Sequence, residues 1–236
     1  MTCSMPRMIL QSVVVAALVA LPACRGPDTP KAADGSASAQ ASTSLILVVG
    51  TSLTAGLGLD PSEAYPAVLQ EKIDSAGFKY LVVNRGVSGE TSAGALQRVD
   101  WLMRQPVAIL ILETGGNDGL RGLDPDSLKA NLEAIVRRAR LQAPPPAVLL
   151  LGMEAPPNLG ADYTVRFRAA YQDAARELGV PLVPFLLAGV GGVDSLNQAD
   201  GIHPTAAGQR RVAALVWEAL LPILRGAAQG RGASTS

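Results

Sequence analysis

The sequence predicts an α/β protein built on an open, doubly wound sheet of five parallel strands. Five short apolar runs recur along the chain, at residues 45–49, 80–83, 107–112, 147–151 and 181–185. These runs are continuous rather than alternating, which is typical of parallel strands that are covered on both faces. A segment with helix signals follows each run, and this alternation favours helices on both sides of a single sheet.

The five expected helices have recognisable ends. They span residues 63–76, 92–104, 125–142, 162–178 and 204–224. Gly77 and Gly179 end the first and the fourth, because glycine readily adopts the left-handed backbone found just after a helix. Asp124 is a suitable N-cap for the third helix, and Pro125 suits its first turn.

The first residues of the chain form a separate segment. Residues 1–7 are basic, residues 8–20 are mostly apolar, and small residues follow, which is the layout of a secretory signal. The apolar part is shorter than the roughly 20 residues that a membrane-spanning helix needs. The stretch LPAC at residues 21–24 resembles a bacterial lipobox. We therefore expect residues 1–23 to be a lipoprotein-type signal peptide.

Under this interpretation Cys24 is lipidated, and the protein is exported to the periplasm of the bacterial cell envelope and attached to a membrane by its lipid. The alternative is that Cys24 is only a small apolar residue at the end of a signal segment. Cys3 is the other cysteine and lies in the signal. The folded domain would then contain no cysteine, which excludes disulfides, thiolate zinc sites and a cysteine nucleophile from it.

The remaining boundaries follow from composition. Residues 24–43 are rich in Ala, Ser, Gly, Asp and Pro and offer almost nothing to bury, so we expect a flexible linker. The folded domain is expected at residues 44–225, and residues 226–236 are expected to be a disordered tail. The chain has 20 basic and 20 acidic residues, and this balance gives no indication of a nucleic-acid partner.

Chemistry is expected at the carboxyl ends of the strands, where ligands bind in doubly wound sheets. Four polar segments follow predicted strands: GTSLTAGLG at residues 50–58, NRGVSGET at 84–91, ETGGNDGLRG at 113–122 and DGIH at 200–203. The first segment lacks the third glycine of a dinucleotide fingerprint and the Gly-Lys-Ser/Thr of a phosphate loop. It also has Thr54 where a G-x-S-x-G elbow needs glycine.

Three residues form a candidate catalytic triad. His203 is the only histidine of the chain, so no other residue can supply an imidazole. Asp200 lies three residues before it, close enough to orient the ring and leave its other nitrogen for the hydroxyl of Ser52. The alternative interpretations are a structural histidine, an ordinary Asp-Gly turn and a serine that only completes a turn.

Two of the polar segments contain candidate oxyanion donors. Asn117 could present its side-chain amide at the end of the third strand, and Gly89 could present its backbone N–H after the second. The backbone N–H of Ser52 is the third candidate. Glycine and asparagine are also common turn residues, so each segment could equally be a plain loop.

Taken together, these motifs resemble the SGNH (GDSL-type) hydrolases, and within them the arylesterase and multifunctional thioesterase/lysophospholipase group. The resemblance covers residues 45–224, and the matching positions are Gly50, Ser52, Leu53, Gly89, residues 115–118, Asp200 and His203. It implies a flavodoxin-like three-layer αβα sandwich. It also implies a serine esterase of broad specificity that hydrolyses small acyl esters through an acyl-enzyme, with no cofactor and no metal. We expect a monomer.

One position departs from the family pattern. Thr51 stands where GDSL sequences have aspartate, so the residue before the proposed nucleophile has a neutral hydroxyl in place of a carboxylate. Two other functions remain open at this point. One is a carbohydrate acetylesterase, because the same architecture removes acetyl groups from sugars. The other is a catalytically silent envelope lipoprotein that binds lipid or glycan.

Overall fold

The computed structural model describes residues 43–233, and its centre is a sheet of five parallel strands. The strand order is β2-β1-β3-β4-β5, so β1 is an interior strand, with β2 added on one side of it and β3, β4 and β5 on the other. The predicted α/β fold with a five-stranded parallel sheet is confirmed. The strands are β1 (Ser44–Gly50), β2 (Tyr80–Gly86), β3 (Ile109–Glu113), β4 (Ala147–Leu151) and β5 (Leu182–Val183).

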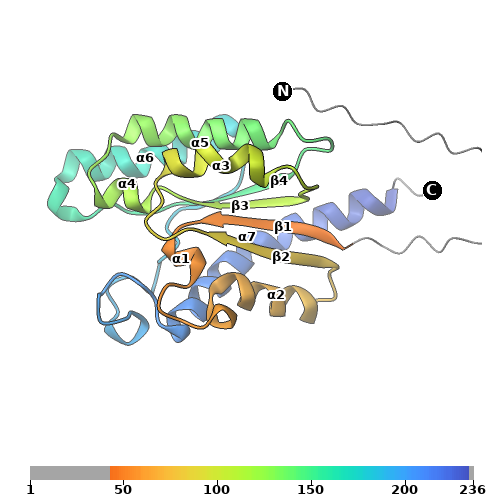
Figure 1. Cartoon of the computed structure of the whole chain (residues 1–236), viewed down its shortest axis with the longest axis horizontal. Helices are drawn as coiled ribbons and strands as arrows, with labels where there is room; N and C mark the ends of the chain where they lie inside the picture. The colour runs from red at the N-terminus through yellow and green to blue at the C-terminus, as the bar shows by residue number, and fades with distance from the viewer. Residues whose placement is uncertain (1–42, 234–236) are drawn as a thin grey trace, which may run out of the picture. The chain divides into compact units, whose positions relative to one another are not determined.

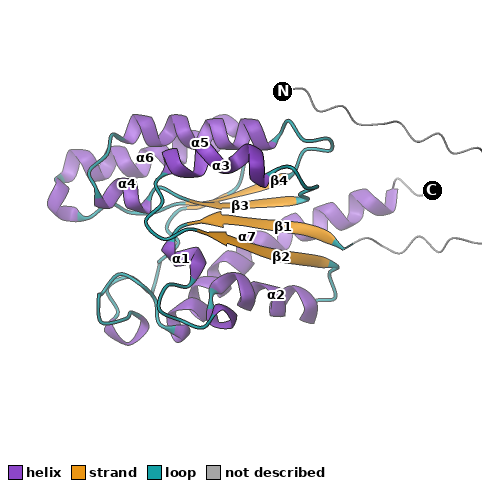
Figure 2. Ribbon diagram, viewed as in Figure 1, coloured by secondary structure: helices purple, strands orange, loops and turns teal. Residues whose placement is uncertain are grey.

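Helices cover both faces of this sheet and complete the three layers (Figure 1). Helices α3 (Ser92–Leu102), α5 (Pro125–Ala139) and α6 (Ala161–Leu178) pack on one face. Helices α2 (Tyr65–Ser75) and α7 (Ala206–Ala233) pack together on the other. Figure 2 shows that loops and short helices gather at the carboxyl ends of the strands. These short elements are α1 (Ser52–Ala55), α4 (Gly116–Leu120) and the 3₁₀ turns η1 (Pro61–Glu63), η2 (Pro157–Leu159) and η3 (Asp194–Leu196).

The pattern of burial explains why the strand sequences are continuously apolar. Every residue of β3 is buried, because β3 lies between two neighbouring strands and under helices on both faces. The edge strand β2 is only partly buried, and its sequence turns polar at Asn84 and Arg85. Tyr65, Phe167 and Tyr171 are the largest fully buried side chains among the described residues. The sheet is therefore a rigid support for the loops at its carboxyl edge.

Several predicted boundaries were wrong. The second strand continues past Val83 to Gly86, because its polar end still pairs in register with the end of β1. The fifth strand, expected at residues 181–185, has only two residues, since Pro184 has no N–H to donate to a neighbouring strand. The other residues of that run, Pro181, Pro184 and Phe185, lie in the loops before and after β5.

The C-terminal helix also differs from the prediction. Helix α7 continues to Ala233, whereas residues 226–236 were expected to be disordered. The segment GAAQGRGA contains three alanines, which favour a helix, and three glycines, which disfavour one, so its composition does not account for the extension. The predicted signal peptide, most of the linker and residues 234–236 lie outside the described residues. Within residues 43–233, no helix combines the length and the apolar character needed to span a membrane.

Candidate active site

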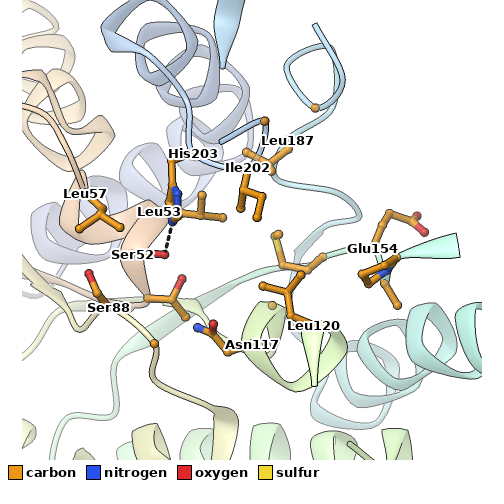
Figure 3. A pocket seen from close by; sticks show the side chains of 18 of the residues that line it. Ser52, Leu53, Leu57, Ser88, Asn117, Leu120, Glu154, Leu187, Ile202 and His203 are labelled. Carbon is orange, nitrogen blue, oxygen red and sulfur yellow. Dashed lines mark hydrogen bonds between the residues drawn. The ribbon is translucent and has the colours of Figure 1, made fainter. Parts of the chain in front are cut away.

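Folding brings the three triad candidates into one chain of contacts at the carboxyl edge of the sheet. Ser52 is the first residue of α1, directly after β1, and His203 lies in the loop before α7. Oγ of Ser52 lies 2.9 Å from Nε2 of His203 (Figure 3). Nδ1 of His203 lies 2.6 Å from Oδ2 of Asp200. The arrangement expected from the sequence spacing is therefore present.

Asp200 holds both the imidazole and its own loop. Its Oδ1 accepts hydrogen bonds from the backbone N–H groups of Ile202, at 2.9 Å, and His203, at 3.0 Å. The pKa of Asp200 is held well below its ordinary value. The hydrogen bond from the backbone N–H of His203 contributes most, followed by the bond from the imidazole and the bond from the backbone N–H of Ile202. An ionised carboxylate can only accept, so Nδ1 carries the proton and Nε2 is left to accept from the hydroxyl of Ser52.

Gln198 fixes the position of this loop relative to the serine. Its backbone N–H donates to the carbonyl of His203 at 2.7 Å. Its side-chain amide donates to the carbonyl of Leu57 at 2.8 Å, and to that of Pro204 at 3.0 Å. Leu57 follows α1, so Gln198 connects the segment that carries Ser52 with the segment that carries His203. No sequence motif indicated this residue, because its partners are distant in the chain.

Both oxyanion candidates from separate loops lie beside Ser52. Gly89 and Asn117 line the same cavity as Ser52, and Figure 3 shows Asn117 and His203 on opposite sides of the serine. Nδ2 of Asn117 donates one hydrogen bond to the carbonyl of Glu90 at 2.9 Å. A primary amide has two N–H groups. The bond to Glu90 therefore orients the amide and leaves its second N–H for a ligand.

The loop that contains Gly89 is held from several directions. Gly89 has φ +78°, a left-handed conformation that favours glycine. Its carbonyl accepts from the guanidinium of Arg121 at 3.0 Å. The next residue, Glu90, forms an ion pair with Arg98, with Nε and Oε1 2.6 Å apart. These contacts with α3 and with the end of α4 fix the conformation of this loop.

A buried carboxyl group lies beneath the serine turn. Glu113 is the last residue of β3 and is fully buried, although it was expected to begin a loop. Its Oε2 accepts from the backbone N–H of Thr51 at 2.7 Å and from the hydroxyl of Thr54 at 2.8 Å. The hydroxyl of Thr51 lies 3.0 Å from both carboxyl oxygens. Burial raises the pKa of Glu113, and these hydrogen bonds oppose the shift.

A cavity of about 410 Å³ opens beside Ser52. Its lining is mainly apolar and includes Leu120, Met153, Pro156, Phe185, Leu187 and Ile202, together with the charged residue Glu154. Figure 3 shows Leu120, Leu187 and Ile202 to one side of Ser52. The segment after β4, residues 153–156, contributes to this lining. The geometry therefore places a serine hydroxyl, an oriented imidazole and an apolar cavity within reach of one bound molecule.

A serine, an imidazole and a carboxylate are aligned at the carboxyl ends of a parallel sheet. This arrangement is suited to a hydrolase that uses a serine nucleophile. The chain belongs to the GDSL-like lipase/acylhydrolase family, whose sequence pattern matches residues 48–211. The resemblance inferred from the motifs is thereby confirmed. Members of this family are enzymes that hydrolyse esters.

Individual relatives agree with this assignment. The chain is 45% identical over 186 residues to an esterase, TesA, of Pseudomonas aeruginosa, covering 78% of this chain and 92% of the relative. It is 37% identical over 186 residues to the thioesterase 1/protease 1/lysophospholipase L1 of Escherichia coli, covering 78% and 86%. A crystal structure of TesA superposes with a TM-score of 0.72 at 46% identity, covering 75% of this chain and 98% of that structure.

Proposed function

We propose that the protein is a serine esterase of broad specificity that hydrolyses acyl esters through an acyl-enzyme. The observation that carries the proposal is the contact chain from Ser52 Oγ to His203 Nε2, and from His203 Nδ1 to Asp200. In this chain the base lies within hydrogen-bond reach of the nucleophile, and a third group orients the base. The names of the relatives, esterase and thioesterase/lysophospholipase, support the same activity.

The acylation step uses all three residues. Oγ of Ser52 attacks the carbonyl carbon of the ester, and Nε2 of His203 takes the hydroxyl proton. Asp200, ionised because of its low pKa, stabilises the imidazolium that forms. The tetrahedral intermediate then collapses, the bond to the leaving alcohol or thiol breaks, and His203 returns the proton to it. In deacylation, water attacks the carbonyl carbon of the acyl-enzyme and His203 takes a proton from it. The bond to Oγ of Ser52 then breaks, His203 returns the proton to the serine, and the acid is released.

Three donors are available for the oxyanion. The backbone N–H of Ser52 lies at the first position of α1, where no carbonyl of the helix can pair with it. The backbone N–H of Gly89 and the second N–H of Asn117 lie on the wall of the same cavity. Such donors stabilise the transition state most when they are fixed beforehand, and the bond of Asn117 to Glu90 provides this for the side chain.

The apolar wall of the cavity supports an acyl chain longer than acetyl. Burial of each methylene group contributes about 0.8 kcal/mol, so a chain of several carbons gains affinity where acetate cannot. We therefore favour acyl esters over acetylated sugars. A series of p-nitrophenyl esters tests this choice. We expect kcat/KM to rise from acetate to butyrate and hexanoate, and activity confined to acetate would refute it.

We also propose that Cys24 is lipidated and anchors the protein to a membrane of the cell envelope. This proposal rests on the sequence of residues 21–24. Fractionation of cells that express the full chain tests it. The wild-type protein is expected in the membrane fraction and Cys24→Ser in the soluble fraction, and an unchanged distribution would exclude the anchor.

A further inference from the structure

We infer that Glu113 is a positioning residue for the esterase reaction and that its buried carboxyl group sets the geometry of the turn that presents Ser52. The inference rests on the proposed function, because it assigns a role to Glu113 only if Ser52 is the nucleophile. Glu113 does not line the cavity and contacts no reacting atom. It would act through the two threonines that flank Ser52.

Glu113 is buried at the end of an apolar strand. The other four residues of β3 are isoleucine and leucine, and all are buried. A carboxyl group in such surroundings is costly unless hydrogen bonds compensate it. None of the ion pairs found within residues 43–233 includes Glu113. Packing alone would favour another leucine, so the acceptor oxygens of Glu113 are the feature to explain.

The oxygens of Glu113 accept hydrogen bonds from residues on both sides of Ser52. Thr51 contributes its backbone N–H and its hydroxyl, and Thr54 contributes its hydroxyl. Thr51 precedes Ser52 and Thr54 lies two residues after it. One side chain thus holds both flanks of the nucleophile without lining the cavity itself. Ser52 lines the cavity, and its hydroxyl lies 2.9 Å from Nε2 of His203.

Gly50 leaves space for the contact between Thr54 and the carboxyl group of Glu113. A Cβ atom on Gly50 would lie 2.6 Å from Oε2 of Glu113 and 1.9 Å from Oγ1 of Thr54. Any side chain at position 50 would therefore displace the contacts that hold the turn. The absence of a side chain at Gly50 therefore leaves room first for Thr54 and then for the carboxyl group of Glu113.

The network extends to the core on both sides. The hydroxyl of Tyr65, from α2, lies 2.8 Å from Oγ1 of Thr54, and when Thr54 donates to Glu113 the phenol donates to Thr54. Tyr65 and Tyr171, from α6, are buried, and burial first and the nearby carboxyl group of Glu113 second raise the pKa of each phenol well above its ordinary value. Both phenols remain neutral and leave Glu113 as the acceptor of the network.

The test separates the rate of the reaction from the stability of the fold. Glu113→Met removes both acceptors at similar size, and misplacement of a catalytic group by about 1 Å can cost about 10²-fold in rate. We expect kcat to fall by about 10²-fold with KM nearly unchanged. Glu113→Gln keeps one acceptor oxygen for Thr51 and Thr54, so it should recover most of this loss. The matched control is Glu133→Gln, which removes another buried carboxylate, on α5, and should keep the wild-type kcat.

Stability is expected to change as well as rate. Glu113→Met leaves the buried backbone N–H of Thr51 and the buried hydroxyls of Thr51 and Thr54 without their acceptor, so the variant should melt below the wild type. Its kcat is therefore measured at a temperature at which circular dichroism shows the variant folded. If Glu113→Met does not fold, Thr51→Val and Thr51→Ser decide. The valine variant lacks one donor and should be slower by about fivefold, since a hydrogen bond of this kind is worth about 1 kcal/mol, whereas the serine variant should match the wild type.

The inference is overturned if kcat of Glu113→Met stays at the wild-type value, if the loss lies only in KM, if Glu113→Gln is as slow as Glu113→Met, or if Thr51→Val is fully active. Ser52→Ala is assayed in parallel. A wild-type rate for Glu113→Met together with an inactive Ser52→Ala refutes the positioning role alone. An active Ser52→Ala refutes the proposed function itself.

Discussion

The hydroxyl of Ser52 and the imidazole of His203 meet at 2.9 Å, although 151 positions separate the two residues in the chain. The contact exists because β1 ends in the middle of the sheet and the loop before α7 returns to the same edge. Neither residue could be brought to the other by local structure alone. The proposed activity therefore depends on the whole fold, and variants near this contact test it.

Asp200→Asn should slow the enzyme without unfolding it. An amide can donate to Nδ1 and thereby favour the tautomer whose Nε2 cannot accept from Ser52, a change that costs up to about 10⁴-fold in kcat where the acid is buried. The side chain of Asp200 is 46% exposed, so water can replace part of its effect, and we expect about 10²- to 10³-fold here. Steady-state kinetics with p-nitrophenyl butyrate measure this loss. Asp194→Asn, at an exposed position before His203, is the control and should be fully active.

Asn117→Ala should retain a low activity. Loss of one oxyanion donor typically costs about 10² to 10³ in kcat, and the backbone donors at Ser52 and Gly89 remain. Asn158→Ala, on the exposed 3₁₀ turn η2, is the matched control. The loss is measured as kcat at saturating ester together with far-UV circular dichroism. A rate equal to that of the control would remove Asn117 from the oxyanion site.

Gly50→Ala should destabilise the protein. Its Cβ would overlap Oγ1 of Thr54 at 1.9 Å, and overpacking of this kind costs about 1–3 kcal/mol or more. Gly226→Ala is the comparison, because its Cβ would meet no atom within 4 Å and its backbone is helical. Urea unfolding of the two variants gives the difference in free energy. Equal midpoints would show that the turn tolerates a side chain at position 50.

The stability conferred by Glu113 should depend on pH. Burial raises its pKa above the ordinary value of 4.5, so between these two pKa values the folded state binds more protons than the unfolded state. The free energy of unfolding therefore falls as pH rises through this window, by at most about 1.4 kcal/mol per pH unit, and is unaffected below it. The difference between the wild type and Glu113→Gln isolates this effect. A difference that is constant from pH 4 upward would contradict the raised pKa.

The sequence was sufficient to predict the sheet and to select Ser52, Asp200 and His203 as candidate triad residues, because the strands and the Asp200–His203 spacing leave local patterns. The buried strands are continuous apolar runs, and Asp200 and His203 are three residues apart in one loop. Glu113 and Gln198 could not be recognised, since their roles depend on partners far away in the chain. A glutamate after four apolar residues resembles the start of a loop, and only the structure shows that it is buried.

One of the boundary errors has a physical cause of the same kind. The end of β2 is polar but pairs with β1, so the pairing and not the composition decides where the strand ends. The segment after Leu224 looks unstructured by its small residues, yet it continues the helix to Ala233. At the end of β2 the neighbouring strand determines the conformation, and that information is absent from the segment itself.

Covalent labelling by a fluorophosphonate probe tests the central claim most directly. The probe reacts with a serine whose hydroxyl is activated by a neighbouring base. The wild-type protein is expected to take up one label, on the peptide that contains Ser52, and Ser52→Ala to take up none. His203→Ala should be labelled far more slowly. Labelling that persists at the wild-type rate in Ser52→Ala, or a wild-type protein that is never labelled, would contradict the assignment of Ser52 as the nucleophile.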